Sequence, residues 1–145
     1  MTLIRPAALL IALLATAPLT WAHDDATLDA TMAPHGGQLR MAGAYPFELV
    51  VAPAAKETKA SPMIVYVTDH AGNGITTVGA TGTATILSGA RKTSITLSPS
   101  VPNRMSGEAA YAVGPESKII VSITLAGKAV ESPRFTPLER SAGRG

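Results

Sequence analysis

Alternation of apolar and polar side chains is the feature that most limits how this chain can fold. In residues 92–98, "KTSITLS", the side chains of Thr93, Ile95 and Leu97 share one face of an extended chain. Residues 118–127, "KIIVSITLAG", repeat this spacing of two. Because a spacing typical of helices is almost absent elsewhere, the pattern predicts half-buried β-strands.

Seven extended segments can be recognised, and sequences rich in Gly, Pro, Asn, Asp and Ser separate them. They are residues 45–52, 62–69, 81–87, 92–98, 104–113, 118–127 and 128–135. Turn sequences about every ten residues are typical of antiparallel sandwiches. The sequence therefore predicts an all-β fold, an antiparallel β-sandwich of the Ig-like or Greek-key kind with about seven strands.

The first residues have the organisation of an export signal. The basic side chain of Arg5 precedes an apolar run over residues 7–19, and the small residues before His23 suit a signal peptidase. The run is short for a bilayer span and contains Pro18, so we expect no membrane span in the mature chain. The predicted organisation is a signal peptide over 1–22, a flexible segment over 23–35, a β-sandwich domain over 36–136 and a flexible tail over 137–145.

The composition argues against several classes of function. The formal net charge is +2, the basic residues are scattered and aromatic residues make up 4% of the chain. This gives no electrostatic footprint for nucleic acid. The chain has no cysteine, so an exported form has neither disulfides nor thiolate ligands nor a thiol nucleophile.

No catalytic motif is recognisable. A nucleophile elbow, a phosphate-binding glycine loop and an H-E-x-x-H helix are absent from the sequence. Residues 69–74, "DHAGNG", place Asp69 and Asn73 as a calcium loop would, but Ala80 stands where a bidentate carboxylate is needed. We interpret this segment as a hairpin turn and expect no enzyme, with an unrecognised hydrolase as a remote third possibility.

The three histidines carry the remaining chemistry. His23 would begin the mature chain, where its amine and imidazole could chelate Cu(II); a solvated amino terminus is the alternative. His35 lies in a Pro-His-Gly-Gly turn, and His70 follows the extended segment 62–69. For both, an exposed turn residue is the alternative to a metal ligand.

Strands of a sandwich that end at one rim could bring His35 and His70 together. Glu48 lies in the intervening strand with parity opposite to Phe47 and Leu49, so its carboxylate could join the two imidazoles if that face is outward. Such nitrogen and oxygen ligands suit Cu(II), Zn(II), Ni(II) or Co(II), and the affinity order favours copper. A thioether site for Cu(I) is a weaker alternative, because the methionines show no close spacing. They are Met32, Met41, Met63 and Met105.

Several short sequences together resemble a known family. "APHGGQLRMAGAYPFELVV", "IVYVTDHAGNGITTVGATGTATIL", "NRMSGEAAYAV" and "KIIVSITLAGK" look like small exported β-sandwich proteins of heavy-metal resistance and efflux systems, which occur alone or fused to efflux adaptor subunits. The likeness covers most of residues 33–135. Its polar pattern matches at His35, Glu48, Asp69 and His70, whereas Ala44 precedes the "FELV" strand near the place where family members often carry another histidine.

The resemblance implies a periplasmic protein that binds a transition metal, with copper ranked first, and acts as a metallochaperone or buffer for an efflux system. The expected ligands are His35 and His70, with Glu48 and His23 as possible further ligands. The expected partners are the metal ion and a periplasmic efflux-pump component. The alternative is a metal-free module that docks a partner protein in the cell envelope through a sheet edge or face.

Overall fold

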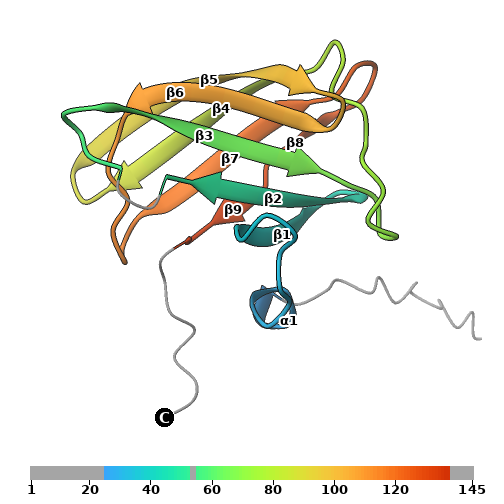
Figure 1. Ribbon diagram of the computed structural model, residues 1–145, viewed down its shortest axis with the longest axis horizontal. Coiled ribbons are helices and arrows are strands. Elements are labelled where there is room, and N and C mark those ends of the chain that lie inside the picture. The colour runs from blue at the N-terminus through green and yellow to red at the C-terminus, as the bar shows by residue number, and fades with distance from the viewer. Residues whose placement is uncertain (1–24, 53–54, 138–145) are drawn as a thin grey trace, which may run out of the picture.

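The structure is a computed structural model that describes residues 25–52 and 55–137 (Figure 1). The predicted leader, His23 and residues 138–145 of the predicted tail lie outside the described residues. Within the described residues, one short helix and nine strands follow each other in sequence. They are α1 (Asp25–Asp29), β1 (Gln38–Ala42), β2 (Tyr45–Val51), β3 (Ala60–Val67), β4 (Thr81–Ser88), β5 (Arg91–Val101), β6 (Arg104–Ala110), β7 (Lys118–Thr124), β8 (Val130–Glu131) and β9 (Arg134–Phe135).

The strands form one antiparallel sheet in the order β1-β2-β3-β6-β5-β4-β7-β8, and β9 also pairs with β7. Strands β4, β5 and β6 are joined by hairpins, and β7 returns beside β4, which is the Greek-key arrangement. The sheet curls round until β9 approaches β1, so the fold is a nearly closed barrel of two facing layers (Figure 1). The all-β prediction is confirmed.

Strand β5 connects the two layers. Its first half pairs with β4 through Gly82↔Leu97 and the positions that follow, whereas its last residues pair with β6. The register shifts between Pro99 and Val101, as expected where a strand bends from one layer into the other. With eleven residues, β5 is the longest of the described strands, since it pairs with β4 in one layer and with β6 in the other.

The structure has two more strands than the sequence predicted. The prediction did not count β1 as a separate strand; it spans five residues, of which Arg40 alone is buried. The last predicted strand, 128–135, divides into β8 and β9 around Ser132 and Pro133. Proline has no backbone N–H to donate to β7, so the ladder is interrupted there.

The alternating segments bury the side chains that the sequence assigned to the core. Ile95 and Leu97 of β5, and Ile119, Val121 and Ile123 of β7, are each no more than 2% exposed. Strands β2, β3, β4, β6 and β9 complete the core with Phe47, Leu49, Met63, Val65, Val67, Ala84, Ile86, Met105 and Phe135. Met63 and Met105, which were candidate thioether ligands, are therefore packing residues.

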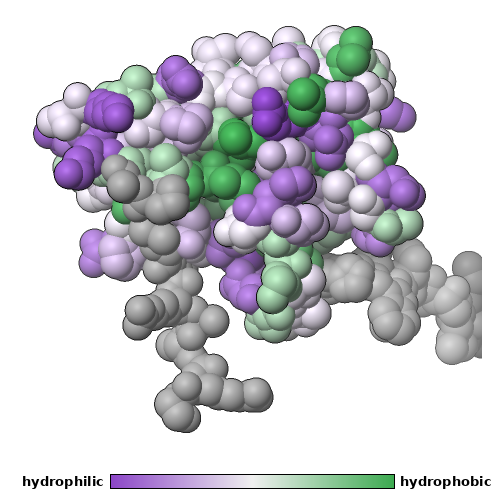
Figure 2. Space-filling model, viewed as in Figure 1, coloured by the Kyte–Doolittle hydropathy of each residue, from purple (hydrophilic) through white to green (hydrophobic). Residues whose placement is uncertain are grey.

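The outer surface mixes side chains of both kinds. On the face shown in Figure 2, hydrophobic side chains gather in a small central area and hydrophilic ones are scattered around it. This distribution agrees with the scattered charge of the sequence. Within residues 25–52 and 55–137, no helix is long and apolar enough to cross a membrane.

Two hydrogen bonds close the seam between β1 and the last strands, and an ion pair attaches α1 to the same edge. The side-chain amide of Gln38 donates to the carbonyl of Thr136 (3.2 Å) and accepts from its N–H (2.8 Å), so it replaces a pair of backbone bonds. Arg40 pairs in register with buried Phe47, which places its side chain on the core side of β1. Its guanidinium, 7% exposed, forms an ion pair with Asp29 of α1.

Tyr111 fixes the connection between β2 and β3. Its phenol is buried, donates to the carbonyl of Pro62 (2.6 Å) and accepts from the N–H of Ala52 (3.1 Å). Burial raises the pKa of this phenol above its ordinary value, and the Ala52 bond lowers it in part. The protonated ring therefore stabilises the fold, and this contribution diminishes as pH rises.

We predict that Tyr111→Phe lowers the free energy of unfolding by about 1–3 kcal/mol, because the carbonyl of Pro62 and the N–H of Ala52 lose a part-buried hydrogen-bond partner. Tyr45→Phe, a matched change at a half-buried ring, should stay within about 0.5 kcal/mol of wild type. Urea unfolding measures both. Above pH ~10 the wild type should lose stability that Tyr111→Phe does not lose, because the Tyr111 phenol ionises more readily in the unfolded chain than in the fold. Equal stability of the two variants would contradict this assignment.

Candidate functional site

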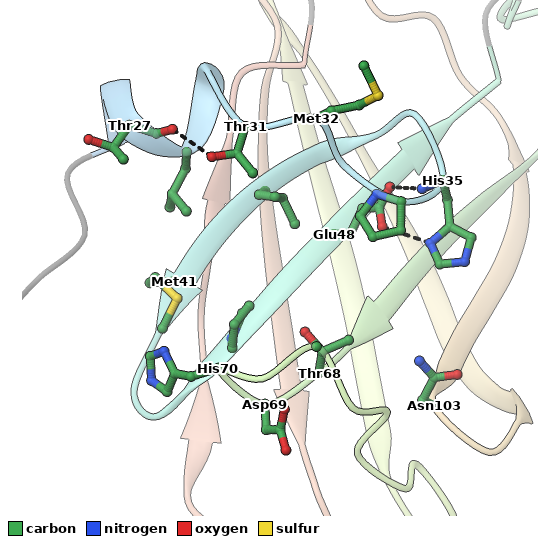
Figure 3. Close-up of a pocket in the computed structure, with 15 residues that line it drawn as sticks. Thr27, Thr31, Met32, His35, Met41, Glu48, Thr68, Asp69, His70 and Asn103 are labelled. Atoms are coloured by element: carbon green, nitrogen blue, oxygen red, sulfur yellow. Dashed lines mark hydrogen bonds and ion pairs between the residues drawn. The ribbon is translucent and has the colours of Figure 1, made fainter.

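A pocket of about 490 Å³ opens on the outer face of β1 and β2 (Figure 3). Helix α1 and the loop after it form one wall, the strands form the floor, and the turn after β3 forms the far end. Apolar atoms form most of the exposed surface of the lining. The apolar residues are Leu28, Met32, Pro34, Leu39, Met41 and Pro46. Polar groups are contributed by His35, Glu48, Asp69, His70 and Asn103, among others.

The carboxylate of Glu48 organises one end of the pocket. Its Oε1 accepts from the backbone N–H of His35 (2.8 Å) and of Gly37 (3.0 Å), and its Oε2 is bonded to Nδ1 of the His35 ring (2.8 Å). Glu48 is 4% exposed although it lies on the outer face of β2, because the 35–37 loop covers it. Three hydrogen bonds compensate for the burial of this carboxylate.

The two glycines explain why the loop can wrap the carboxylate. Gly36 has φ +73°, a left-handed conformation that side chains disfavour. It turns the N–H groups on either side of it toward one acceptor, an arrangement known to bind anions. A Cβ on Gly37 would lie 2.3 Å from the carbonyl oxygen of Leu49, so only glycine fits against β2. The Pro-His-Gly-Gly sequence therefore forms a cradle for Glu48.

The His35 ring is held in one orientation and one tautomer. It stacks on Tyr66 with ring centroids 3.6 Å apart and planes 4° from parallel. Tyr66 is the β3 residue opposite Glu48, so both partners of the ring come from one row of the sheet. A carboxylate oxygen only accepts, so Nδ1 carries the proton and the lone pair of the neutral ring is on Nε2. The side chain is 42% exposed, and Nε2 points away from Glu48 (Figure 3).

The predicted site residues are only partly brought together. His35 and Glu48 meet, but Glu48 supports the ring, because both of its oxygens are already bonded to the 35–37 loop. His70 lines the same pocket at its other end, beside Met41 and apart from His35 (Figure 3). His23 lies outside the described residues. In the part of the chain that the structure describes, no three His, Cys, Asp or Glu side chains form a group that could hold a metal ion.

Asp69 forms a turn, as the sequence suggested. Its Oδ1 accepts from the N–H groups of Ala71 and Asn73 (both 2.8 Å), and its Oδ2 accepts from the Asn73 side chain (2.9 Å). The Asn73 side chain, followed by its backbone N–H, holds the pKa of this carboxyl below its ordinary value. The segment is thus a hydrogen-bonded turn that presents His70 at the pocket.

Sequence reasoning missed the two residues that attach α1 to the sheet. Asp29 and Arg40 are eleven positions apart, and only the folded chain shows that a helix lies against the edge of β1. Arg40 could have been recognised from its position in the sequence, because its parity within the strand is that of a residue facing the core. A charged side chain at such a position needs a charged partner.

Comparison with known proteins adds no family assignment, because no protein-family model and no curated protein matches the chain.

We predict that Glu48→Gln reverses the tautomer of His35. The amide NH₂ would replace Oε2 as the partner of Nδ1, so Nδ1 would accept and the proton would move to Nε2. Long-range ¹H–¹⁵N spectra of the imidazoles distinguish the two tautomers. Glu57→Gln is the matched control, since Glu57 pairs with Arg91 on the surface. An Nδ1–H ring in both variants would show that Glu48 does not set the tautomer.

Proposed function

We propose that this protein binds a divalent transition metal, copper first, through Nε2 of His35. The observation that carries this proposal is the 2.8 Å bond between Nδ1 of His35 and the buried carboxylate of Glu48. Metal-binding histidines commonly donate their second ring nitrogen to a carboxylate, which fixes the ring and strengthens the ligand. Here the same arrangement leaves the Nε2 lone pair on a rigid, partly exposed ring.

In this proposal Glu48 holds the ligand His35 through hydrogen bonds and does not itself bind the metal. His70 borders the same pocket from the turn after β3, so it remains a candidate for a further donor if that turn moves. His23 remains a candidate at the amino terminus that signal cleavage would create. Solvent completes the coordination of a site with few protein ligands, and such a site exchanges its ion readily.

Fast exchange suits a carrier or buffer better than an enzyme. Together with the resemblance of the "APHGG" and "FELV" sequences to exported metal-resistance proteins, it supports a periplasmic protein that buffers copper or delivers it to an efflux system. Zn(II), Ni(II) and Co(II) are further candidate ions, because an imidazole can coordinate each of them. Copper ranks first because its affinity for such ligands is the highest of the four.

The apolar lining of the pocket favours a second candidate function. Met32 is 93% exposed at its edge, and Leu39 and Met41 lie on its floor. An apolar recess with a few polar groups suits a side chain of a partner protein. The metal-free docking module is therefore the alternative.

Titration with Cu(II) and Zn(II) at neutral pH tests the metal proposal. We expect one Cu(II) site of about micromolar Kd or tighter, its loss in His35→Ala, and an affinity about 10–100-fold lower in Glu48→Gln. Glu57→Gln should bind as the wild type does. Electron paramagnetic resonance of the Cu(II) form should show nitrogen coordination that His35→Ala removes.

Other outcomes have distinct meanings. Weaker binding in His70→Ala would show that the turn after β3 contributes a ligand. Binding that survives in His35→Ala but is lost from a chain that begins at Asp25 would move the site to His23. No binding above buffer background in the wild type would contradict the metal proposal and favour the docking module.

A further inference from the structure

The segment that forms one wall of the pocket is attached to the sheet at two places. We define the strap as residues 25–34, which comprise α1 and the loop that leads to His35. It lines one side of the pocket with Leu28, Met32 and Pro34 (Figure 3). Leu39 and Met41 of β1, which are partly buried, lie on the pocket floor that the strap borders.

The two ends of the strap are held by different interactions. Directly after its last residue, the N–H groups of His35 and Gly37 are bonded to buried Glu48. At its amino end, Asp29 is bonded to Arg40 through Oδ1–Nη1 (2.7 Å) and Oδ2–Nη2 (3.3 Å). Gln38 adds a bond to Asp29 (3.2 Å), and Asp25 lies 3.5 Å from Nε of Arg40.

Apolar packing contributes little to the amino end. None of the five residues of α1 is buried, and Leu28 is its only partly buried apolar residue. Ala33, which is buried, lies next to the Glu48 anchor at the other end. A helix of five residues has almost no stability of its own, because the cost of starting a helix is spread over too few bonds. The position of α1 therefore depends on the Asp29–Arg40 ion pair.

We propose that the strap is a hinged cover whose amino-terminal part, residues 25–32, lifts from the sheet when the Asp29–Arg40 pair breaks, while the 35–37 loop stays fixed on Glu48. Lifting exposes Leu39 and Met41 and widens the pocket beside His35. The cover thus controls access to the apolar floor. This device goes beyond metal binding and operates whether or not an ion is bound.

Hydrogen exchange of individual amides, measured by NMR without metal, tests this proposal. The N–H groups of Ala30 and Thr31 are bonded within the strap, to the carbonyls of Ala26 and Leu28, and report its opening. Buried Val65 of β3 and Val121 of β7 report global unfolding. In Asp29→Asn we expect exchange at Ala30 and Thr31 to accelerate about tenfold or more while Val65 and Val121 stay unchanged.

Asp25→Asn is the matched control, because Asp25 is 69% exposed and farther from Arg40. We expect less than about a threefold change there, as for an exposed pair. Sodium chloride at about 0.5 M should accelerate exchange at Ala30 and Thr31 in the wild type more than in Asp29→Asn, because salt screens only an existing ion pair. The dye 8-anilinonaphthalene-1-sulfonate should gain fluorescence with Asp29→Asn if the apolar floor is uncovered.

Two results would overturn the hinged cover. Exchange at Ala30 and Thr31 that is as slow in Asp29→Asn as in the wild type would show that the ion pair does not hold the strap. Equal acceleration at all four amides would show that the strap is an inseparable part of the fold. Because no readout uses a metal ion, failure of the copper site would leave this test intact.

Discussion

The buried carboxylate of Glu48 is the interaction on which the arrangement of the site depends. A charged group on the outer face of a sheet is ordinarily solvated, and burying it is costly unless donors replace the water. Here the 35–37 loop supplies three donors, one of them the imidazole of His35. The same bonds that compensate the burial also orient the ring, fix its tautomer and bring the chain before β1 across the sheet, so the pocket and its histidine have a common cause.

A second buried charge sits on the opposite side of the same edge. Arg40 lies toward the core where β1 and β9 do not complete a hydrogen-bonded ladder, and α1 supplies the acidic partner. Glu48 and Arg40 are thus compensated by the two ends of one short segment. The amino-terminal segment before β1 is therefore part of the architecture of this edge. The prediction of a flexible segment over 23–35 did not anticipate the helix within it.

The fold could be predicted because strand periodicity is a local property. The spacing of two between Ile95 and Leu97, and between Ile119 and Val121, indicates a buried strand face from only a few residues. The short strand β1 and the division at Pro133 depend on which neighbours supply hydrogen bonds, and that information is not local. The parity of Glu48 correctly placed its side chain on the other face of β2 from Phe47. Its burial, however, depends on the loop around His35, thirteen residues away in the sequence. For the same reason, sequence spacing could not show that His70 and His35 occupy separate ends of one pocket.

The two hydrogen bonds between Gln38 and Thr136 join positions 98 residues apart, which is nearly the whole length of the described chain. Such a long-range contact can form only after most of the polypeptide is available, because the intervening segment must first be ordered. Until then β1 presents an unsatisfied edge, and its counterpart near β9 is equally unsatisfied. At high concentration two partly folded molecules could therefore complete each other by exchanging their amino-terminal strands, which makes this seam the place where a domain-swapped dimer would arise.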